Sequence, residues 1–140
     1  MAALDPVQQE RIVGAVIRIT DLGLLRALPL TALGRGLPAL SPEQRERIVD
    51  AVLGTRDWYY RAIALAGLGA GLAALTPERQ ERIVDAALGI VDERCRAFAL
   101  ARLAHVHGKL HARVFTDATR IGSLYWRANA LAGLANGIAE

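Results

Sequence analysis

Hydrophobic positions along the chain form two kinds of helical pattern. In residues 42–53, four aliphatic residues recur at helical spacing, and charged residues occupy the opposite side. This pattern is typical of an amphipathic helix that buries one face. Residues 62–75 are instead apolar or glycine on every side. A helix of that composition is normally covered all round, so we expect such segments to be sandwiched between neighbours.

The amphipathic segment occurs three times, and this repetition is the strongest signal in the sequence. The copies begin at Leu4, Leu40 and Leu75, and each continues with a cap residue, a proline and then an Arg-Ile-Val run. A second block, Arg-Ala-x-Ala-Leu-Ala-x-Leu, also occurs three times. A fixed period of this kind indicates a repeat architecture. We expect one domain over residues 1–140, divided into units at about 4–39, 40–74, 75–106 and 107–140.

Each unit is predicted to contain two helices. In units one to three the first helix begins at an Asp, Ser or Thr followed by proline, because the cap satisfies a free backbone N–H and proline loses nothing at the first helical position. The caps predicted for the second helices are Asp21, Asp57, Asp92 and Ser123. The sequence therefore predicts an all-α fold. We expect a right-handed stack of about four helical hairpins, which is an α-solenoid of about eight helices.

Two features interrupt the pattern. Pro29 is expected to break or restart the second helix of unit one after Leu28, because an interior proline costs about 3 kcal/mol. Gly69 and two neighbouring glycines lie within the apolar segment 62–75, and each costs about 1 kcal/mol relative to alanine. Either stacked hairpins approach closely at these glycines, or the helix breaks near Gly69.

The repeated pattern resembles the α-solenoid class of helical-hairpin repeats, and its length is close to that of tetratricopeptide, HEAT and pentatricopeptide repeats. The resemblance covers nearly the whole chain and is one of architecture. The Trp…Leu-Gly…Tyr pattern of tetratricopeptide repeats is absent from the first helices, and residues 48–52 do not match the pentatricopeptide core. We assign the general class and no named subfamily. The class implies scaffolding or the binding of peptides and proteins.

The composition excludes several other classes. The chain is 53% hydrophobic with a mean hydropathy of +0.25, which excludes disorder. The single cysteine, Cys95, cannot form an internal disulfide and is expected to be a small buried residue. No signal peptide is evident, and the longest uncharged stretch, residues 62–77, is too short to span a bilayer. We expect a cytoplasmic protein without membrane contact.

Three arginines recur four residues after the second-helix caps. They are Arg61, Arg96 and Arg127. An Asp–Arg pair at this spacing stabilises a helix by a few tenths of a kcal/mol. One interpretation is a ladder that ties neighbouring units together. The other is a row of guanidinium groups that binds an acidic peptide or phosphate.

Five of the seven aromatic residues gather where the second helices of units two and four begin. They are Trp58, Tyr59, Tyr60, Tyr125 and Trp126. Because Trp, Tyr and Arg dominate binding hot spots, these residues together with Arg61, Arg96 and Arg127 are our candidate partner-binding surface. The alternative is that the aromatic rings fill gaps between hairpins.

The last helix lacks a polar outer face. Leu131, Leu134 and Ile138 are therefore candidate self-association residues on an exposed apolar end. The alternative is that the shortened last unit folds back over this end.

No motif in the sequence indicates catalysis, a cofactor or a metal. The glycines of residues 67–71 lack the Lys-Ser/Thr ending of a phosphate loop. The histidines at 105, 107 and 111 have no cysteine or carboxylate nearby in sequence, so we expect a solvated loop there and no zinc site.

We therefore predict a protein-interaction or scaffold module that self-associates and is not an enzyme. Nucleic-acid binding through the recurring arginines is the alternative. It is disfavoured because acidic residues are interspersed and the net charge is only +3. A regulatory fragment of a larger helical protein is a further possibility.

Overall fold

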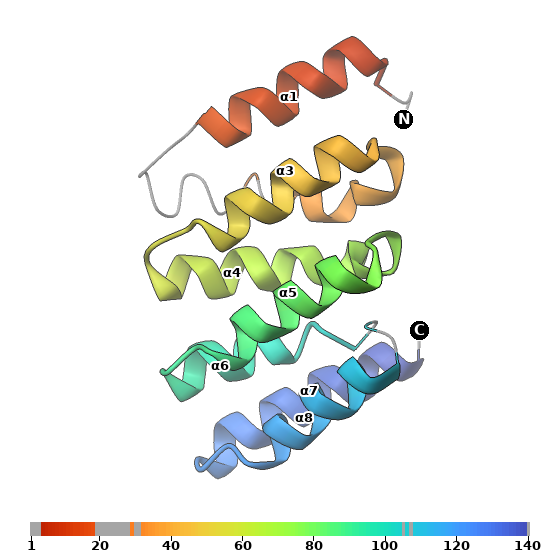
Figure 1. The fold of residues 1–140 in the computed structure, drawn as a ribbon. Coiled ribbons are helices and arrows are strands. Elements are labelled where there is room, and N and C mark those ends of the chain that lie inside the picture. Colours follow the sequence, from red (N-terminus) through yellow and green to blue (C-terminus); the bar gives the residue numbers. More distant parts are fainter. Residues whose placement is uncertain (1–3, 19–28, 30–31, 105, 107, 140) are drawn as a thin grey trace.

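The chain, described here from a computed structural model, is all-α, as the sequence pattern predicts. The structure describes residues 4–18, 29, 32–104, 106 and 108–139, and no strand occurs among them. Its labelled α-helices are α1 (Pro6–Arg18), α3 (Pro42–Leu53), α4 (Trp58–Leu68), α5 (Pro77–Leu88), α6 (Glu93–Leu100), α7 (Gly108–Thr119) and α8 (Leu124–Ala139) (Figure 1). Two short 3₁₀ helices, η1 (Leu37–Ala39) and η2 (Gly69–Ala74), lie ahead of α3 and α5. Residues 32–35 are also helical, whereas the predicted cap Asp21 and the predicted break after Leu28 lie outside the described residues.

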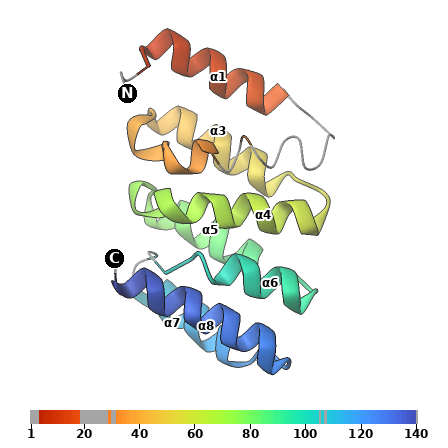
Figure 2. The same ribbon diagram turned by 180° about the vertical axis from the view of Figure 1, so that it is seen from behind.

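The helices form two stacked layers (Figures 1 and 2). The first-helix layer consists of α1, α3, α5 and α7, each in contact with the next. The second-helix layer contains α4, α6 and α8, again in contact in chain order. The pairs α3–α4, α5–α6 and α7–α8 are hairpins that link the layers. Tandem hairpins thus cover each other's apolar faces, and α1 and α7–α8 lie at opposite ends of the stack.

The helices of the hairpins begin at the caps that the sequence indicates. Ser41 and Gln44 form a capping box, with Gln44 N donating to Ser41 Oγ at 3.2 Å and Ser41 N donating to Gln44 Oε1 at 3.1 Å. Asp57 accepts from the amides of Tyr59 and Tyr60, and Asp92 accepts from the amide of Cys95. Because these contacts are local, the helix starts follow directly from the sequence.

The core is one aliphatic cluster that runs through the stack from Val13 to Leu134. Ile48 and Ile83, at the same position of units two and three, are both fully buried. Each such side chain contributes roughly 1.5–3 kcal/mol on burial. None of the described helices combines the length and the apolar content needed to cross a bilayer.

The apolar segment of unit two changes helix type at Gly69. Helix α4 ends at Leu68, and the chain continues as the 3₁₀ helix η2. The single helix over residues 62–75 is therefore wrong, and the alternative of a break near Gly69 is confirmed. The expected close approach is also present, because a Cβ atom at Gly69 would overlap the carbonyl oxygen of Arg102. A Cβ atom at Gly71 would likewise overlap the carbonyl oxygen of Gly34.

Polar side chains of the first-helix layer hold these 3₁₀ turns in place. Arg45 and Gln80 occupy the same repeat position. Arg45 Nε donates to the carbonyl oxygen of Leu37 at 2.9 Å. Gln80 Nε2 donates to the carbonyl oxygens of Leu72 and Leu75 at 3.0 and 3.2 Å. Gln80 is fully buried, so its amide satisfies backbone groups that water cannot reach.

Ion pairs connect successive helices of the first-helix layer. Arg82 of α5 pairs with Asp50 of α3 at 2.7 Å and with Glu46 at 2.8 Å. Arg79 also pairs with Glu46. Equivalent contacts join the other steps of the stack, namely Arg47–Glu10 (2.5 Å) and Arg113–Asp85 (2.6 Å). A ladder of arginines between units therefore exists. Of the three arginines that the sequence singled out, Arg96 takes part in it through Asp117 of the last unit, and the other rungs use different residues.

Candidate functional site

The predicted aromatic residues form two separate patches. On α4, Trp58 and Tyr59 are half exposed, and Tyr59 meets Tyr60 edge-to-face with ring centroids 5.4 Å apart. On α8, Tyr125 is exposed and lies edge-to-face with the half-buried Trp126 at 4.6 Å. Helix α6 lies between α4 and α8 (Figure 2). The structure therefore does not bring the five rings into one surface.

Helix α6 carries no aromatic residue at the positions of these patches. Cys95 stands there, at the position of Tyr60 and Trp126, and is 7% exposed. Burial raises the pKa of its thiol, and a hydrogen bond to Asp92 acts in the same direction. The expectation of a small buried residue is confirmed. A thiol held protonated in this way is a poor nucleophile.

Two of the three recurring arginines are engaged within the chain. Arg61 Nε donates to the carbonyl oxygen of Thr55 at 2.7 Å, and Arg96 donates to that of Ile90 at 2.8 Å. Each of these two side chains thus stabilises the loop between the two helices of its own hairpin. Arg96 also approaches Asp117 of α7, with Nε and Oδ2 3.3 Å apart. Arg127 is half-buried, and its side chain makes no hydrogen bond or ion pair with another described residue.

The candidate self-association residues lie mostly inside the stack. Leu134 is only 2% exposed and belongs to the core, so it does not form part of an exposed end. Leu131 is half-buried and packs against the core. For Ile138 the side chain lies outside the described part of the chain. The shortened last unit continues the stack, because α7 contacts α5 and α8 contacts α6.

Other apolar residues are exposed at this end of the stack. Phe115 occupies the repeat position of Val49 and Val84, both fully buried, yet it is 50% exposed. Leu124, at the start of α8, is 74% exposed. At the position of Phe115 the last unit thus leaves uncovered a side chain that units two and three bury.

A groove of about 780 Å³ crosses the second-helix layer and is lined by residues of α4, α6 and α8. These three helices lie side by side in Figure 2. Most residues that line it are alanine or glycine. The larger apolar side chains in it are Ile63, Phe98 and Trp126, and the charged ones are Arg35 and Arg102. Among the predicted site residues, only Trp126 lines this groove. Small residues in the floor allow the backbone of a bound segment to approach closely.

The groove contains the positions at which the repeats differ. Within the block Arg-Ala-x-Ala-Leu-Ala-x-Leu, the remaining positions are identical in all three copies. The first variable position holds Ile63, Phe98 and Asn129. The second holds Gly67, Arg102 and Gly133. All six of these residues line the groove. Both variable positions of the block therefore line the groove in every copy, beside constant alanines such as Ala97 and Ala101.

Sequence analysis missed Phe98 and Arg102, although the signal was present. These residues lie four apart, on the side of the segment opposite the buried Leu100, and Phe98 is 46% exposed. A large apolar residue and a charge at the variable positions of an otherwise constant block are the features that a repeat alignment could have used to find them.

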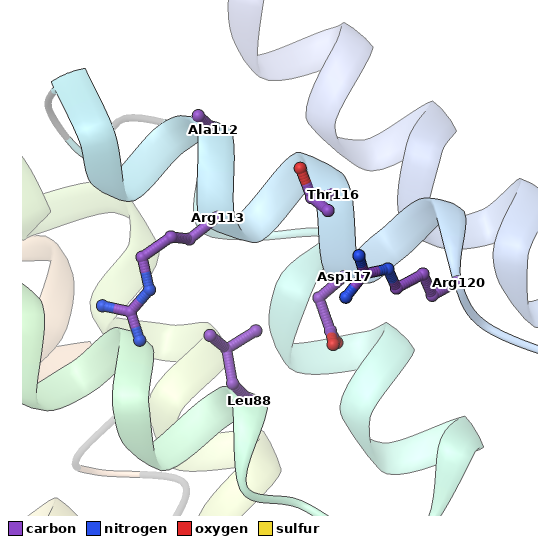
Figure 3. Close-up of a pocket in the computed structure, with 6 residues that line it drawn as sticks. All are labelled: Leu88, Ala112, Arg113, Thr116, Asp117 and Arg120. Atoms are coloured by element: carbon purple, nitrogen blue, oxygen red, sulfur yellow. The ribbon is translucent and has the colours of Figure 1, made fainter.

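A second, shallower hollow of about 350 Å³ lies beside α7 (Figure 3). Arg113, Asp117 and Arg120 line it. Arg113 pairs with Asp85, and Asp117 faces Arg96, so the charges of this hollow are largely matched within the chain. Among the described residues no group of three side chains could hold a metal ion. His105 and His107 lie outside the described residues.

No protein-family model, no curated protein and no solved structure matches the chain.

Proposed function

We propose that this chain is a protein-interaction module whose groove across α4, α6 and α8 binds a segment of a partner protein. The observation that supports the proposal is the location of the two variable positions of the repeated block. Six residues at these positions, from three units, line a single groove. Packing demands the same residues at each step of a stack, whereas a binding surface demands different ones. The resemblance to helical-hairpin repeats points to the same kind of function.

Phe98 is the expected centre of binding. It is 46% exposed in a groove whose other apolar residues are mainly small. An exposed ring costs free energy in water, and a partner that covers it recovers that energy. Large aromatic side chains surrounded by small residues are typical binding hot spots. The lining includes no carboxylate, histidine or thiol among the described residues, which suits binding better than acid–base chemistry.

The charge pattern disfavours the alternative of nucleic-acid binding. Arginines of the first-helix layer, such as Arg47, Arg82 and Arg113, are paired with carboxylates of the preceding helix. Phosphate binding would have to break these pairs. A basic face needs segregated charge, and this layer has alternating charge.

The test is peptide display on the immobilised chain, followed by fluorescence anisotropy of the selected peptides. Phe98→Ala should weaken their binding at least tenfold, since loss of a hot-spot side chain costs about 2 kcal/mol or more. Tyr59→Ala is the matched control, because Tyr59 is 51% exposed and lies outside the groove. Selection of no peptide, or equal binding by both variants, would overturn the proposal.

We also propose that the chain self-associates through the uncovered end formed by α7 and α8. Phe115 is 50% exposed where its equivalents Val49 and Val84 are fully buried. Light scattering over a range of concentrations should show mass above that of one chain, and Phe115→Glu should restore 15.0 kDa. A wild-type mass of one chain at all concentrations would contradict this part of the proposal.

A further inference from the structure

We infer that the segment bound in the groove is acidic, with carboxylates placed against Arg35 and Arg102 and an apolar side chain placed against Phe98. This inference depends on the function proposed above and names the chemistry of the partner. The charges in the groove are all of one sign. The only charged residues lining the groove among those described are these two arginines.

The two arginines reach the groove from opposite neighbours of α4. Arg35 follows Gly34, where a Cβ atom would overlap the carbonyl oxygen of Gly67. Arg102 belongs to unit three, and its own carbonyl oxygen lies against Gly69. Units one and three therefore both approach the last turn of α4, and each brings an exposed arginine to it. Both arginines therefore line the groove near the last turn of α4.

The arginines of the groove differ from those of the first-helix layer. Arg47 and Arg82 each have a carboxylate partner on the preceding helix. Neither Arg35 nor Arg102 forms an ion pair with another described residue. Unmatched guanidinium groups beside an apolar floor favour a partner that supplies carboxylates, because a charge-assisted bidentate contact is stronger than contact with water alone.

The side chains that line the groove change from apolar to cationic along the direction of the helices. Helices α4, α6 and α8 run parallel (Figure 2). Phe98 precedes Arg102 by four residues, or about one turn, so both lie on the same side of the chain. Trp126 lies near the start of α8, at a repeat position that precedes that of Phe98. A complementary segment therefore carries its apolar residue about one turn away from its carboxylates.

The test uses a displayed library of random peptides with equal numbers of acidic and basic codons. Peptides selected on the wild type should be enriched in Asp and Glu, beside at least one large apolar residue. Their affinity should fall tenfold or more for Arg102→Glu, and it should fall as salt is raised. Arg11→Glu is the matched control, because Arg11 is exposed on α1 and far from the groove.

A second variant controls for loss of the fold. Arg102→Gln removes the charge without reversing it, and it should weaken binding up to about fivefold, the range for an exposed ion pair. Circular dichroism melts should match the wild type for both variants. If Arg102→Glu melts earlier, Arg102→Gln decides the question.

The outcomes separate this inference from the proposed function. Selected peptides that need Phe98 but are not acidic, and that bind Arg102→Glu as tightly as the wild type, overturn the inference and leave the groove a binding site. Selection of no Phe98-dependent peptide overturns the proposed function itself. If a fluorescent oligouridylate binds instead, and Arg102→Glu abolishes that binding, the arginines bind nucleic acid and the inference is wrong.

Discussion

The two layers of the stack hold their units together by different means. In the first-helix layer, successive helices are joined by arginine–carboxylate pairs such as Arg82–Asp50, over a buried aliphatic stripe. In the second-helix layer, successive segments meet at small residues, and a Cβ atom at Gly69 or Gly133 would collide with the neighbouring unit. The first kind of contact tolerates small shifts in spacing, whereas the second does not.

This difference separates assembly from recognition. In the first-helix layer, long charged side chains of successive helices are paired with one another. The small residues of the second-helix layer bring backbones close together and leave a groove above them, where Phe98 remains half exposed. The layer with the tightest contacts is thus also the one that is open to a bound segment.

The largest effect is expected from a single added methyl group in the second-helix layer. Gly69→Ala places a Cβ atom on the carbonyl oxygen of Arg102, which is backbone and cannot turn away. We expect a loss of about 3 kcal/mol in the free energy of unfolding, measured by urea denaturation.

Gly36→Ala is the matched control for this variant. A Cβ atom at Gly36 would lie 3.6 Å from the carbonyl oxygen of Leu33, an ordinary contact, and its φ of −89° suits any residue. The control should be neutral or stabilising by a few tenths of a kcal/mol. Equal stability of the two variants would contradict the tight contact between the second helices of units two and three.

A smaller loss is expected for Gln80→Leu. The substitution keeps the buried volume but leaves the carbonyl oxygens of Leu72 and Leu75 without this donor. The carbonyl oxygen of Leu72 still accepts from Leu75 N at 3.0 Å, so the unpaired acceptor is that of Leu75. One buried acceptor left unpaired costs about 1–3 kcal/mol, and we expect a loss of about 2 kcal/mol.

Gln9→Leu tests the same repeat position at the end of the stack. Gln9 donates one bond, to the carbonyl oxygen of Leu4 at 3.2 Å, in an exposed setting. Its loss should cost less than about 0.5 kcal/mol. If Gln80→Leu and Gln9→Leu reduce the free energy of unfolding equally in urea, the hydrogen bonds from Gln80 to Leu72 and Leu75 give the interior unit no extra stability.

Local features of the fold could be predicted from the sequence, whereas features that depend on two units could not. Capping at Asp57 and Asp92 depends on amides within three residues, so the cap residue and its spacing suffice. The partners of Arg61 and Arg96 are backbone carbonyl oxygens, which every residue has and no side-chain pattern reveals. The sequence suggested either a ladder between units or a binding row for these arginines. Both hold loops, and Arg96 also pairs with Asp117 of the next unit.

The groove was missed for a related physical reason. Hydrophobic spacing tells which face of a helix is apolar, but not which apolar residue a neighbour covers. Leu134 and Phe98 both belong to apolar segments, yet the first is 2% and the second 46% exposed. The stacking of α6 between α4 and α8 decides between them. A comparison of the three copies of the repeated block also separates them, because Leu134 stands at a constant position and Phe98 at a variable one.

The smallest effect is expected in the charged ladder, and it depends on pH. Hydrogen bonding to Arg79 and Arg82 holds the pKa of Glu46 below its ordinary value of 4.5 in the folded chain. The ionised carboxylate therefore stabilises the fold above that value. The contribution is lost as the pH falls through the lower, folded pKa, because the proton then binds both states.

Glu46→Gln should accordingly reduce stability by less than about 1 kcal/mol at pH 7, since the carboxylate is more than a third exposed and solvent screens the pairs. The difference from wild type should shrink in acid, as the pH falls below 4.5 and the carboxylate takes up a proton. Glu81→Gln is the control, because Glu81 holds the same repeat position in unit three and forms no ion pair with a described residue. Urea denaturation at pH 7 and in acid measures how much each of the two variants changes the free energy of unfolding. An equal, pH-independent loss in both would show that the ladder contributes no more than isolated surface charges, and that the first-helix layer is held by its aliphatic stripe alone.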